Sequence, residues 1–361
     1  MNISENSILS PDAEMPKAAV AVSVVIPFFN AEKTLKRCIN SLLALPSDSF
    51  EVILVNNNST DDSPQVAQTA AKRYPQRFIY AEEKKRGPVF ARNRGAGLAR
   101  GEILAFIDAD CLVEPDWLPQ LLRSFEDPQT GAVAGRVSGQ GGRTVFDKFH
   151  ALFTFRGPRR PQVYRRFTLI SGGFPTANLA VRKEVFQRTG GFDPSLKFFA
   201  EDYDLCARIY REGFHIRYNP EAIVSHIHRN SLAGTWKQSY GFGTGHALLL
   251  RRHFKRRLII ELPRCCFESE KLPLRAWIDL ASADKKLIGL LTVSLFWWPL
   301  MGLTALYLAF LFREMQTRIK ADQMTSSRQE TWALVFLLFF KSFAMTLGRI
   351  DGALRNRVLC F

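Results

Sequence analysis

Residues 22–29 read VSVVIPFF, an apolar run that is interrupted only by Ser23. Such a run is typical of a parallel strand that is covered on both faces, because neither side is left for water. Similar runs follow at residues 51–55 (EVILV) and 103–108 (ILAFID). Between them the sequence predicts helices at 31–45, 66–74 and 89–99 and a short strand near 78–81. This alternation of strand and helix predicts a doubly wound, mainly parallel α/β sheet.

Polar residues follow two of these predicted strands directly. Asn56 opens a polar turn after residues 51–55, and Asp108 ends the run 103–108. In doubly wound sheets the ligand binds beyond the carboxyl ends of the strands. We therefore expect Asn56 and Asp108 to lie at a ligand site.

The composition narrows the class of protein without identifying a partner. The chain has 361 residues, 47% hydrophobic and 23% charged, so most of it is expected to fold. Its 29 Phe and six Trp exceed the needs of a soluble core and favour apolar surface that faces lipid. The net charge of +15 indicates an anionic partner: nucleic acid, a phosphorylated substrate or anionic lipid headgroups.

The cysteines and the N-terminus bear on the compartment. The six Cys form no CxxC pair, which argues against a zinc module and a disulfide framework and favours reduced thiols. Residues 1–20 lack the basic and apolar regions of a signal peptide, so we expect a disordered lead there. The folded part that follows is therefore expected in the cytoplasm.

The C-terminal part predicts contact with a membrane. Leu287–Phe312 contains no charged residue and is long enough to cross a hydrocarbon core of about 30 Å. Trp297-Trp298-Pro299 near its middle leaves open a straight span, a kink or a re-entrant hairpin. Trp332–Leu347 is a second apolar helix, and its Lys341 leaves a span and an interfacial helix open. A buried core helix is the alternative for Leu287–Phe312.

Two pairs of carboxylates are candidates for chemistry. Asp108 and Asp110 follow a buried strand, and their oxygen ligands favour Mg²⁺ or Mn²⁺ bridging to a diphosphate, although surface pairs of this kind are common. Glu201 and Asp202 precede a predicted helix, where they either cap its N-terminus or supply a general base. His226, in the segment His226-Ile227-His228, is either a metal ligand or an ordinary core or surface histidine.

Together these segments resemble the inverting family 2 glycosyltransferases of the GT-A fold. The resemblance covers about residues 20–230 and rests on four ordered motifs: VSVVIPFFN, VNNNSTD, ARNRGAGLARGEILAFIDAD and FFAEDYDLCARIYREG. It implies direct displacement at the anomeric carbon of a nucleotide-sugar. By resemblance, Pro27 and Phe28 line the nucleoside pocket, Asn56 contacts the base and Arg92 lies near the diphosphate.

The resemblance also implies roles for the acidic residues and for one histidine. Asp108 approaches the ribose and the metal, and Asp110 binds the metal directly. Asp202 is the general base on the acceptor hydroxyl, with Glu201 beside it, and His226 contacts the metal or a phosphate. The family turn opens with Asp where this chain has Asn56. This difference concerns the residue that is expected to contact the nucleobase. The resemblance favours uracil as that base, and therefore a UDP-sugar as the donor.

We therefore expect a GT-A domain at 21–235, a basic amphipathic connector at 236–284 and a membrane region at 285–361. The expected activity is that of a metal-dependent glycosyltransferase of the hexosyltransferase type, building a glycolipid or envelope polysaccharide. It would sit on the cytoplasmic membrane, with the catalytic domain facing the cytoplasm. Its expected partners are a nucleotide-sugar donor, a lipid-linked or saccharide acceptor and anionic membrane lipids, but no nucleic acid.

Three other functions remain open. A polyprenyl-phosphate sugar synthase would use the same fold with a lipid phosphate as acceptor. The charge of +15 also allows a nucleic-acid-binding protein, although no nucleic-acid motif accompanies it. An inactive GT-A scaffold is the third alternative, for which Asn56 is the only hint.

Overall fold

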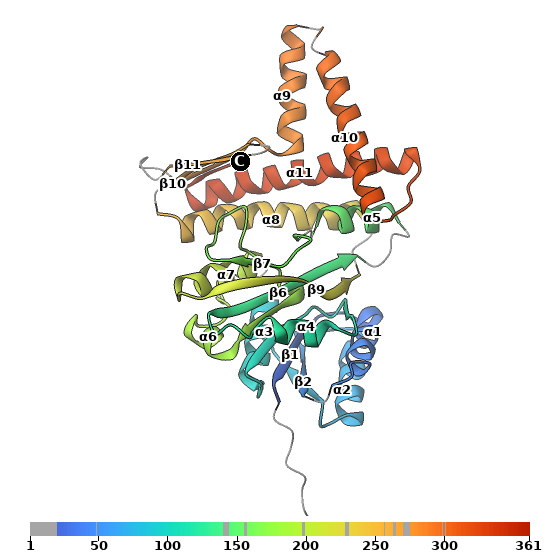
Figure 1. The fold of residues 1–361 in the computed structure, drawn as a ribbon, viewed down its shortest axis with the longest axis vertical. Helices are drawn as coiled ribbons and strands as arrows, with labels where there is room; N and C mark the ends of the chain where they lie inside the picture. Colours follow the sequence, from blue (N-terminus) through green and yellow to red (C-terminus); the bar gives the residue numbers. More distant parts are fainter. Residues whose placement is uncertain are drawn as a thin grey trace, which may run out of the picture.

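The computed structural model describes residues 20–361 except 48, 140–143, 155–156, 197–198, 228–230, 256, 263–264, 270–274, 298 and 300. Almost all of the lead predicted at residues 1–20 therefore lies outside the described residues. The described chain forms two layers, a central-sheet domain and a C-terminal helical layer that covers one end of it (Figure 1).

A nine-stranded mixed sheet forms the N-terminal domain, with strand order β3-β2-β1-β4-β8-β6-β9-β5 and with β7 paired to β9. Its strands are β1 (Val22–Phe28), β2 (Phe50–Asn56), β3 (Phe78–Glu82), β4 (Ile103–Phe106), β5 (Cys111–Val113), β6 (Thr130–Gly139), β7 (Gln162–Tyr164), β8 (Leu179–Arg182) and β9 (His215–His226). Strands β1 to β4 are parallel, as their apolar sequences predict.

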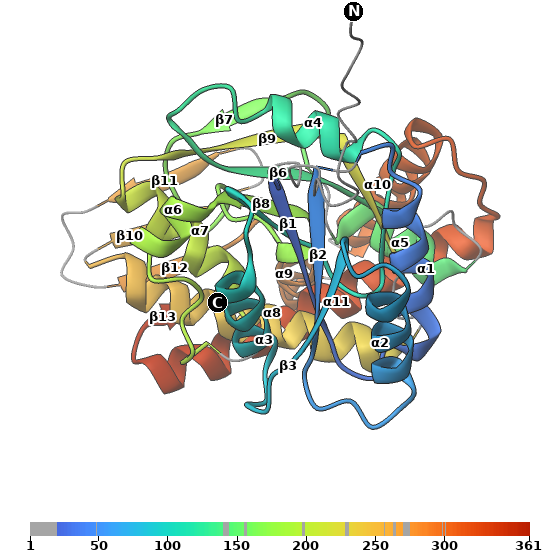
Figure 2. The same ribbon diagram turned by 90° about the horizontal axis from the view of Figure 1, so that it is seen from below.

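Helices cover both faces of this sheet (Figure 2). On one face α1 and α2 pack their apolar side chains, such as Leu35, against β1 and β2. On the other face α3 comes so close that a Cβ at Gly95 would lie 2.4 Å from Cγ1 of Val25. The helices of this domain, with a 3₁₀ turn among them, are α1 (Glu32–Leu43), α2 (Ser63–Arg73), α3 (Pro88–Leu98), α4 (Trp117–Arg123), α5 (Val145–Phe153), η1 (Thr176–Asn178), α6 (Lys183–Arg188) and α7 (Glu201–Arg211).

The C-terminal layer is built on two long helices, α8 (Leu232–His253) and α11 (Arg328–Asn356), which lie side by side (Figure 1). Glycines allow their backbones to meet: a Cβ at Gly348 would lie 2.1 Å from the carbonyl oxygen of Tyr240, and one at Gly243 would lie 2.1 Å from that of Met345. A second sheet flanks the pair, formed by β10 (Arg257–Glu261), β11 (Cys266–Ser269), β12 (Arg275–Asp279) and β13 (Leu359–Cys360). The segment 236–284 contributes most of α8 and the strands β10, β11 and β12 to this layer, and its role as a basic amphipathic connector stays a prediction.

The apolar segment Leu287–Phe312 is divided between two helices, α9 (Ala283–Phe296) and α10 (Met301–Ala321), on either side of Trp297 and Pro299. Pro299 has no amide hydrogen to donate and its ring is poorly tolerated inside a helix, which accounts for the break. The two helices form a hairpin that projects from the molecule (Figure 1). The segment is therefore not one straight helix, and a re-entrant course in a membrane stays a prediction.

The second predicted apolar helix, Trp332–Leu347, lies within the longer α11. Among the described residues α11 is the one helix that is long and apolar enough to cross a membrane, with a mean hydropathy of 1.7 in its most apolar window. It runs along α8 and across the foot of the hairpin (Figure 1). A third of that window is buried inside the molecule.

Candidate active site

A buried arginine joins the two carboxylate motifs. Arg92, on α3, donates from Nη2 to Oδ1 of Asp108 at 2.9 Å and from Nη1 to Oε1 of Glu201 at 3.0 Å. Its side chain is 6% exposed, and that of Glu201 is 8% exposed. The arginine therefore connects the carboxyl end of β4 to the N-terminus of α7. The sequence motifs placed Arg92 near a diphosphate but did not predict that both terminal nitrogens would be held by carboxylates.

The second carboxylate of α7 lies in a different electrostatic environment. Burial raises the pKa of Asp202 to about 7, and the negative charge of Glu201 acts in the same direction. The amide of Tyr203, which donates to Oδ1 of Asp202 at 2.9 Å, and the charge of Arg92 act against this rise in pKa. Because Glu201 is engaged by Arg92, Asp202 is the carboxylate suited to accept a proton near neutral pH.

Helix α8 sets the position at which α7 begins. Ala200, directly before Glu201, has a left-handed φ of 71°, which is uncommon for a residue with a side chain. A Cβ at Gly241 would lie 2.1 Å from the ring of Phe199, and one at Gly245 would lie 3.1 Å from Cβ of Ala200. Because these glycines have no side chain, the turn formed by Phe199 and Ala200 can pack directly against the backbone of α8. The alternating glycines of Gly241-Phe-Gly-Thr-Gly245 are the sequence signal for this contact, which the motifs of the catalytic domain do not include.

A second contact ties α7 to the end of α8. Asp204 is buried and accepts hydrogen bonds from Nε of Arg208 and from Nε2 of His253, both at 2.9 Å. These bonds and the nearby positive charge hold the pKa of Asp204 below its ordinary value, although burial acts against them. Neither Asp204 nor His253 was predicted from the sequence, because 49 residues separate them.

The predicted metal ligands are partly brought together. Nε2 of His226 lies 3.2 Å from Oδ1 of Asp110, because β5 pairs with β9 and sets Cys111 opposite His226. Ligand atoms of Asp110, Cys111 and His226 lie within 4.8 Å of one another. Burial raises the pKa of the Cys111 thiol well above its ordinary value, so this sulfur is a poor ligand for a metal ion.

A carboxylate oxygen and an imidazole nitrogen suit Mn²⁺, and the oxygen alone suits Mg²⁺. Asp108 is not in the group of Asp110, Cys111 and His226, and one of its oxygens binds Arg92. His228 lies outside the described residues.

The predicted nucleoside pocket lies where β1 and β2 end. Their register sets Phe28 beside Asn56, and both Pro27 and Phe28 are buried. Oδ1 of Asn56 accepts from the amide of Ser59 at 3.0 Å. The contacts of these three residues with a nucleoside stay a prediction.

The residue after Asn56 has a structural role that the sequence did not predict. Asn57 donates from Nδ2 to the carbonyl oxygens of Glu83 and Lys85, at 2.9 and 2.7 Å, and accepts from the amide of Gly87 at 2.9 Å. It therefore ties the loop that leads into α3, and so into Arg92, to the end of β2.

Comparison with known proteins shows what this chain is similar to. Residues 23–190 match the family model described as Glycosyl transferase family 2. The chain is similar to the pre-mycofactocin glycosyltransferase of Mycobacterium tuberculosis, with 30% identity over 236 residues that cover 64% of this chain and 48% of that protein. It is also similar to the probable glycosyltransferase YdaM of Bacillus subtilis, with 25% identity over 93% of this chain and 75% of that protein.

A solved structure shares the fold along most of the chain. The mannosyltransferase PcManGT from Pyrobaculum calidifontis, in complex with GDP-Man and Mn²⁺, has a TM-score of 0.52 and 19% identity, over 95% of this chain and 91% of that one. The match to the M. tuberculosis protein spans about half of that protein's length. The strand order, the carboxylates at the sheet edge and the shared fold confirm the predicted GT-A fold, and over residues 23–190 the chain matches glycosyl transferase family 2.

Proposed function

We propose that this protein transfers a sugar from a nucleoside diphosphate sugar, with inversion, to a hydroxyl of a lipid-linked or saccharide acceptor at a membrane surface. The observation that carries the proposal is the Arg92 bridge, which joins Asp108 at the sheet edge to Glu201 beside Asp202. It ties one donor-side carboxylate, Asp108, to Glu201, the residue next to the proposed proton acceptor.

Asp202 is the proton acceptor in this proposal. As the acceptor oxygen bonds to the anomeric carbon, its proton passes to the Asp202 carboxylate. The bond between the anomeric carbon and the β-phosphate oxygen breaks, and the nucleoside diphosphate leaves with that electron pair. A pKa of about 7 matches this task, because the carboxylate is ionised in half of the molecules near neutral pH and still binds a proton well.

Asp110 and His226 are the proposed ligands of a divalent cation, with Asp108 reaching toward the same ion and the ribose. When bound, Mg²⁺ or Mn²⁺ supplies positive charge that stabilises the leaving diphosphate. Pro27, Phe28 and Asn56 are proposed to hold the nucleoside, and a UDP-sugar is the preferred donor. Arg92 is proposed to position Asp108 and Glu201.

The hairpin is the proposed membrane-binding element. Its tip carries Leu295 and Phe296, which are 86% and 87% exposed, and Leu306 is 67% exposed. Exposed apolar side chains gathered on one projecting element favour burial in lipid. We propose that the protein is located at the cytoplasmic membrane, with its catalytic domain on the cytoplasmic side. The proposed functional division is a catalytic domain at 21–235, a connector at 236–284 and a membrane region at 285–361.

A donor panel tests the proposed function. Detergent-solubilised protein is mixed with UDP- and GDP-sugars and Mn²⁺, and release of the nucleoside diphosphate is measured with and without membrane lipid extract. We expect release from one donor, and we expect Asp110→Ala to abolish it. Asp116→Asn should retain this release, because Asp116 is an exposed acidic residue that follows β5. No release in either condition, from protein that remains folded, would refute the enzyme and favour an inactive scaffold.

A polyprenyl-phosphate sugar synthase is the second candidate, favoured by the net charge of +15. Its acceptor is a phosphate oxygen that is already ionised and needs no general base. The Asp202→Asn variant separates the two functions. Transfer to a hydroxyl acceptor should be lost in this variant, whereas transfer to a lipid phosphate should persist.

A further inference from the structure

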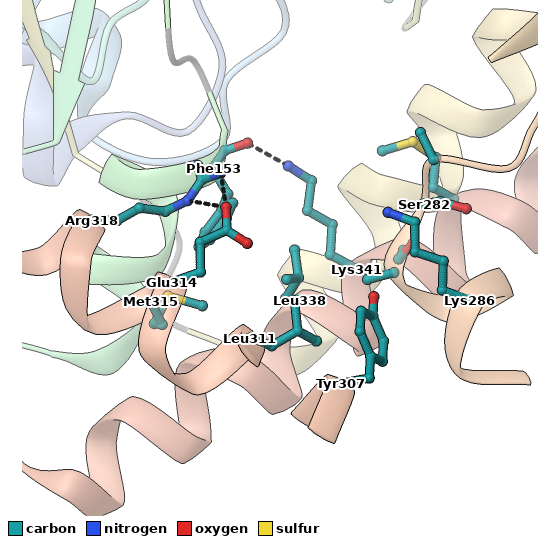
Figure 3. A pocket seen from close by; sticks show the side chains of 14 residues that line it. Phe153, Ser282, Lys286, Tyr307, Leu311, Glu314, Met315, Arg318, Leu338 and Lys341 are labelled. Carbon is teal, nitrogen blue, oxygen red and sulfur yellow. Dashed lines mark hydrogen bonds and ion pairs between the residues drawn. The ribbon is translucent and has the colours of Figure 1, made fainter. Parts of the chain in front are cut away.

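A cavity of about 330 Å³ lies at the foot of the hairpin, on the side of α11 (Figure 3). Side chains of α5, α9, α10 and α11 and of the segment before α9 line it. They belong to Phe153, Ala281, Ser282, Ala283, Lys286, Tyr307, Leu311, Glu314, Met315, Arg318, Leu338, Lys341, Ser342 and Met345. None of the residues proposed for catalysis is among them, so the cavity is separate from the active site.

The feature that demands an explanation is Lys341. Its Nζ donates to the carbonyl oxygen of Phe153 at 2.6 Å (Figure 3). It also lies 5.9 Å from the centre of the Phe149 ring. An ammonium group has three donors, and within the described part of the chain this one forms no ion pair with a carboxylate. Lys341 is half-buried, and a cation that is partly desolvated without a counter-ion is unfavourable, so an anion is expected to join it.

The other charged side chains that line the cavity add to its excess of positive charge. Arg318 lies across from Lys341 and is paired with Glu314, whose Oε1 accepts from its Nε at 3.0 Å. Lys286 reaches the rim from the first turn of α9. The lining therefore carries three cationic groups and one carboxylate, a net charge of +2 from these four side chains.

Most of the remaining lining is apolar and continues onto exposed side chains of the hairpin. Tyr307, Leu311 and Leu338 form one wall of the cavity (Figure 3). On the same helix as Tyr307 and Leu311, the side chains of Leu306 and Phe310 are exposed. A ligand that fits both the cationic and the apolar part of the cavity has an anionic headgroup, which pairs with the lysines, and a hydrocarbon chain, which packs against the hairpin.

We propose that this cavity binds the phosphate headgroup of an anionic membrane lipid, with the phosphate at Lys341 and Lys286 and the acyl chains along α10. The inference rests on the membrane association proposed above and gives that association a specific site. It explains why a lysine lies in the apolar face of α11: bound lipid supplies the missing negative charge. A soluble phosphate offers the same anion without the chains, and the experiment below separates the two.

The test measures lipid binding to the full chain in a non-ionic detergent by native mass spectrometry and by titration calorimetry. Dioctanoyl phosphatidylglycerol is compared with dioctanoyl phosphatidylcholine, which is zwitterionic, and with inorganic phosphate. We expect phosphatidylglycerol to bind and the other two to bind at least about tenfold more weakly. Lys341→Gln is expected to raise the Kd for phosphatidylglycerol about tenfold or more, which corresponds to about 1.4 kcal/mol.

The matched control is Lys320→Gln, which removes the same charge from an exposed position on α10 outside the cavity and should leave the Kd unchanged. Leu311→Trp, which fills the apolar part, is a second variant in case Lys341→Gln does not fold, and it should also weaken binding. Equal weakening by Lys320→Gln, or equal affinity for phosphatidylcholine or inorganic phosphate, would overturn the proposal. Release of the nucleoside diphosphate is measured in parallel, so a failure of the enzymatic proposal is seen separately from a failure of lipid binding.

Discussion

The pH dependence of the reaction offers a direct test of Asp202. With a pKa of about 7, this carboxylate is ionised in about one-tenth of the molecules at pH 6 and in about nine-tenths at pH 8. If ionised Asp202 accepts the proton, kcat/KM should rise about tenfold between these two values. A carboxylate with the ordinary Asp pKa of 3.8 is fully ionised throughout this range and would leave kcat/KM flat.

Glu201 provides the second part of this test. Its negative charge is the second cause of the raised pKa, so Glu201→Gln should move the midpoint of the pH profile about one pH unit toward acid. One pH unit corresponds to about 1.4 kcal/mol of interaction between the two carboxylates. Arg92, freed from its partner, acts on Asp202 in the same direction.

The assay follows release of the nucleoside diphosphate during transfer, from pH 5.5 to 8.5, at constant ionic strength and below KM. Glu212→Gln is the matched control, because Glu212 lies at the other end of α7 and faces solvent. Its profile should coincide with that of the unchanged protein. A flat profile, or a midpoint in Glu201→Gln that moves toward alkaline pH, would refute the assignment of Asp202 as general base.

Three further predictions concern the metal site and the stability of the fold. Asp110→Asn should reduce donor turnover at least about 100-fold and weaken Mn²⁺ binding in calorimetry, whereas Asp116→Asn should change neither; full activity of Asp110→Asn would exclude it as a ligand. Gly348→Ala should lower the free energy of unfolding by about 1–3 kcal/mol in chemical denaturation, because its Cβ would lie 2.1 Å from a backbone oxygen of α8. Gly289→Ala, whose Cβ meets no atom within 4 Å, should be neutral or stabilising by up to about 1 kcal/mol, so equal losses in the two variants would contradict the close helix packing. Glu51→Gln should lower the free energy of unfolding by about 2 kcal/mol, because this buried carboxylate accepts three hydrogen bonds and an amide nitrogen cannot accept. An unchanged denaturation midpoint would contradict this role of Glu51.

Much of the catalytic domain follows from local sequence. The strands β1, β2 and β4 are mostly apolar because they are covered on both faces. Since parallel strands end at the same edge of a sheet, the order of these runs is sufficient to place Asn56 and Asp108 at that edge. Glu201 and Asp202 can likewise be placed at a helix N-terminus from the pattern that follows them.

The helical layer was predicted less completely. The absence of charge in Leu287–Phe312 indicates an apolar segment, but it does not distinguish a straight helix from two arms folded on each other. The break at Trp297 to Pro299 and the packing of the hairpin against α11 decide that question. The cavity at the foot of the hairpin could not be predicted either, because its lining comes from four helices and a loop that are far apart along the chain.

The sequence by itself determined the order of strands and helices, the sheet class and the residues available for chemistry, because hydrophobic periodicity and strand termini are local properties. Only the tertiary structure decided which of those residues act on one another. Arg92 reaches Glu201 across 109 positions, and α8 receives the turn before α7 through glycines that have no side chain to obstruct it. These contacts depend on the packing of whole elements against each other, which no local pattern of residues specifies.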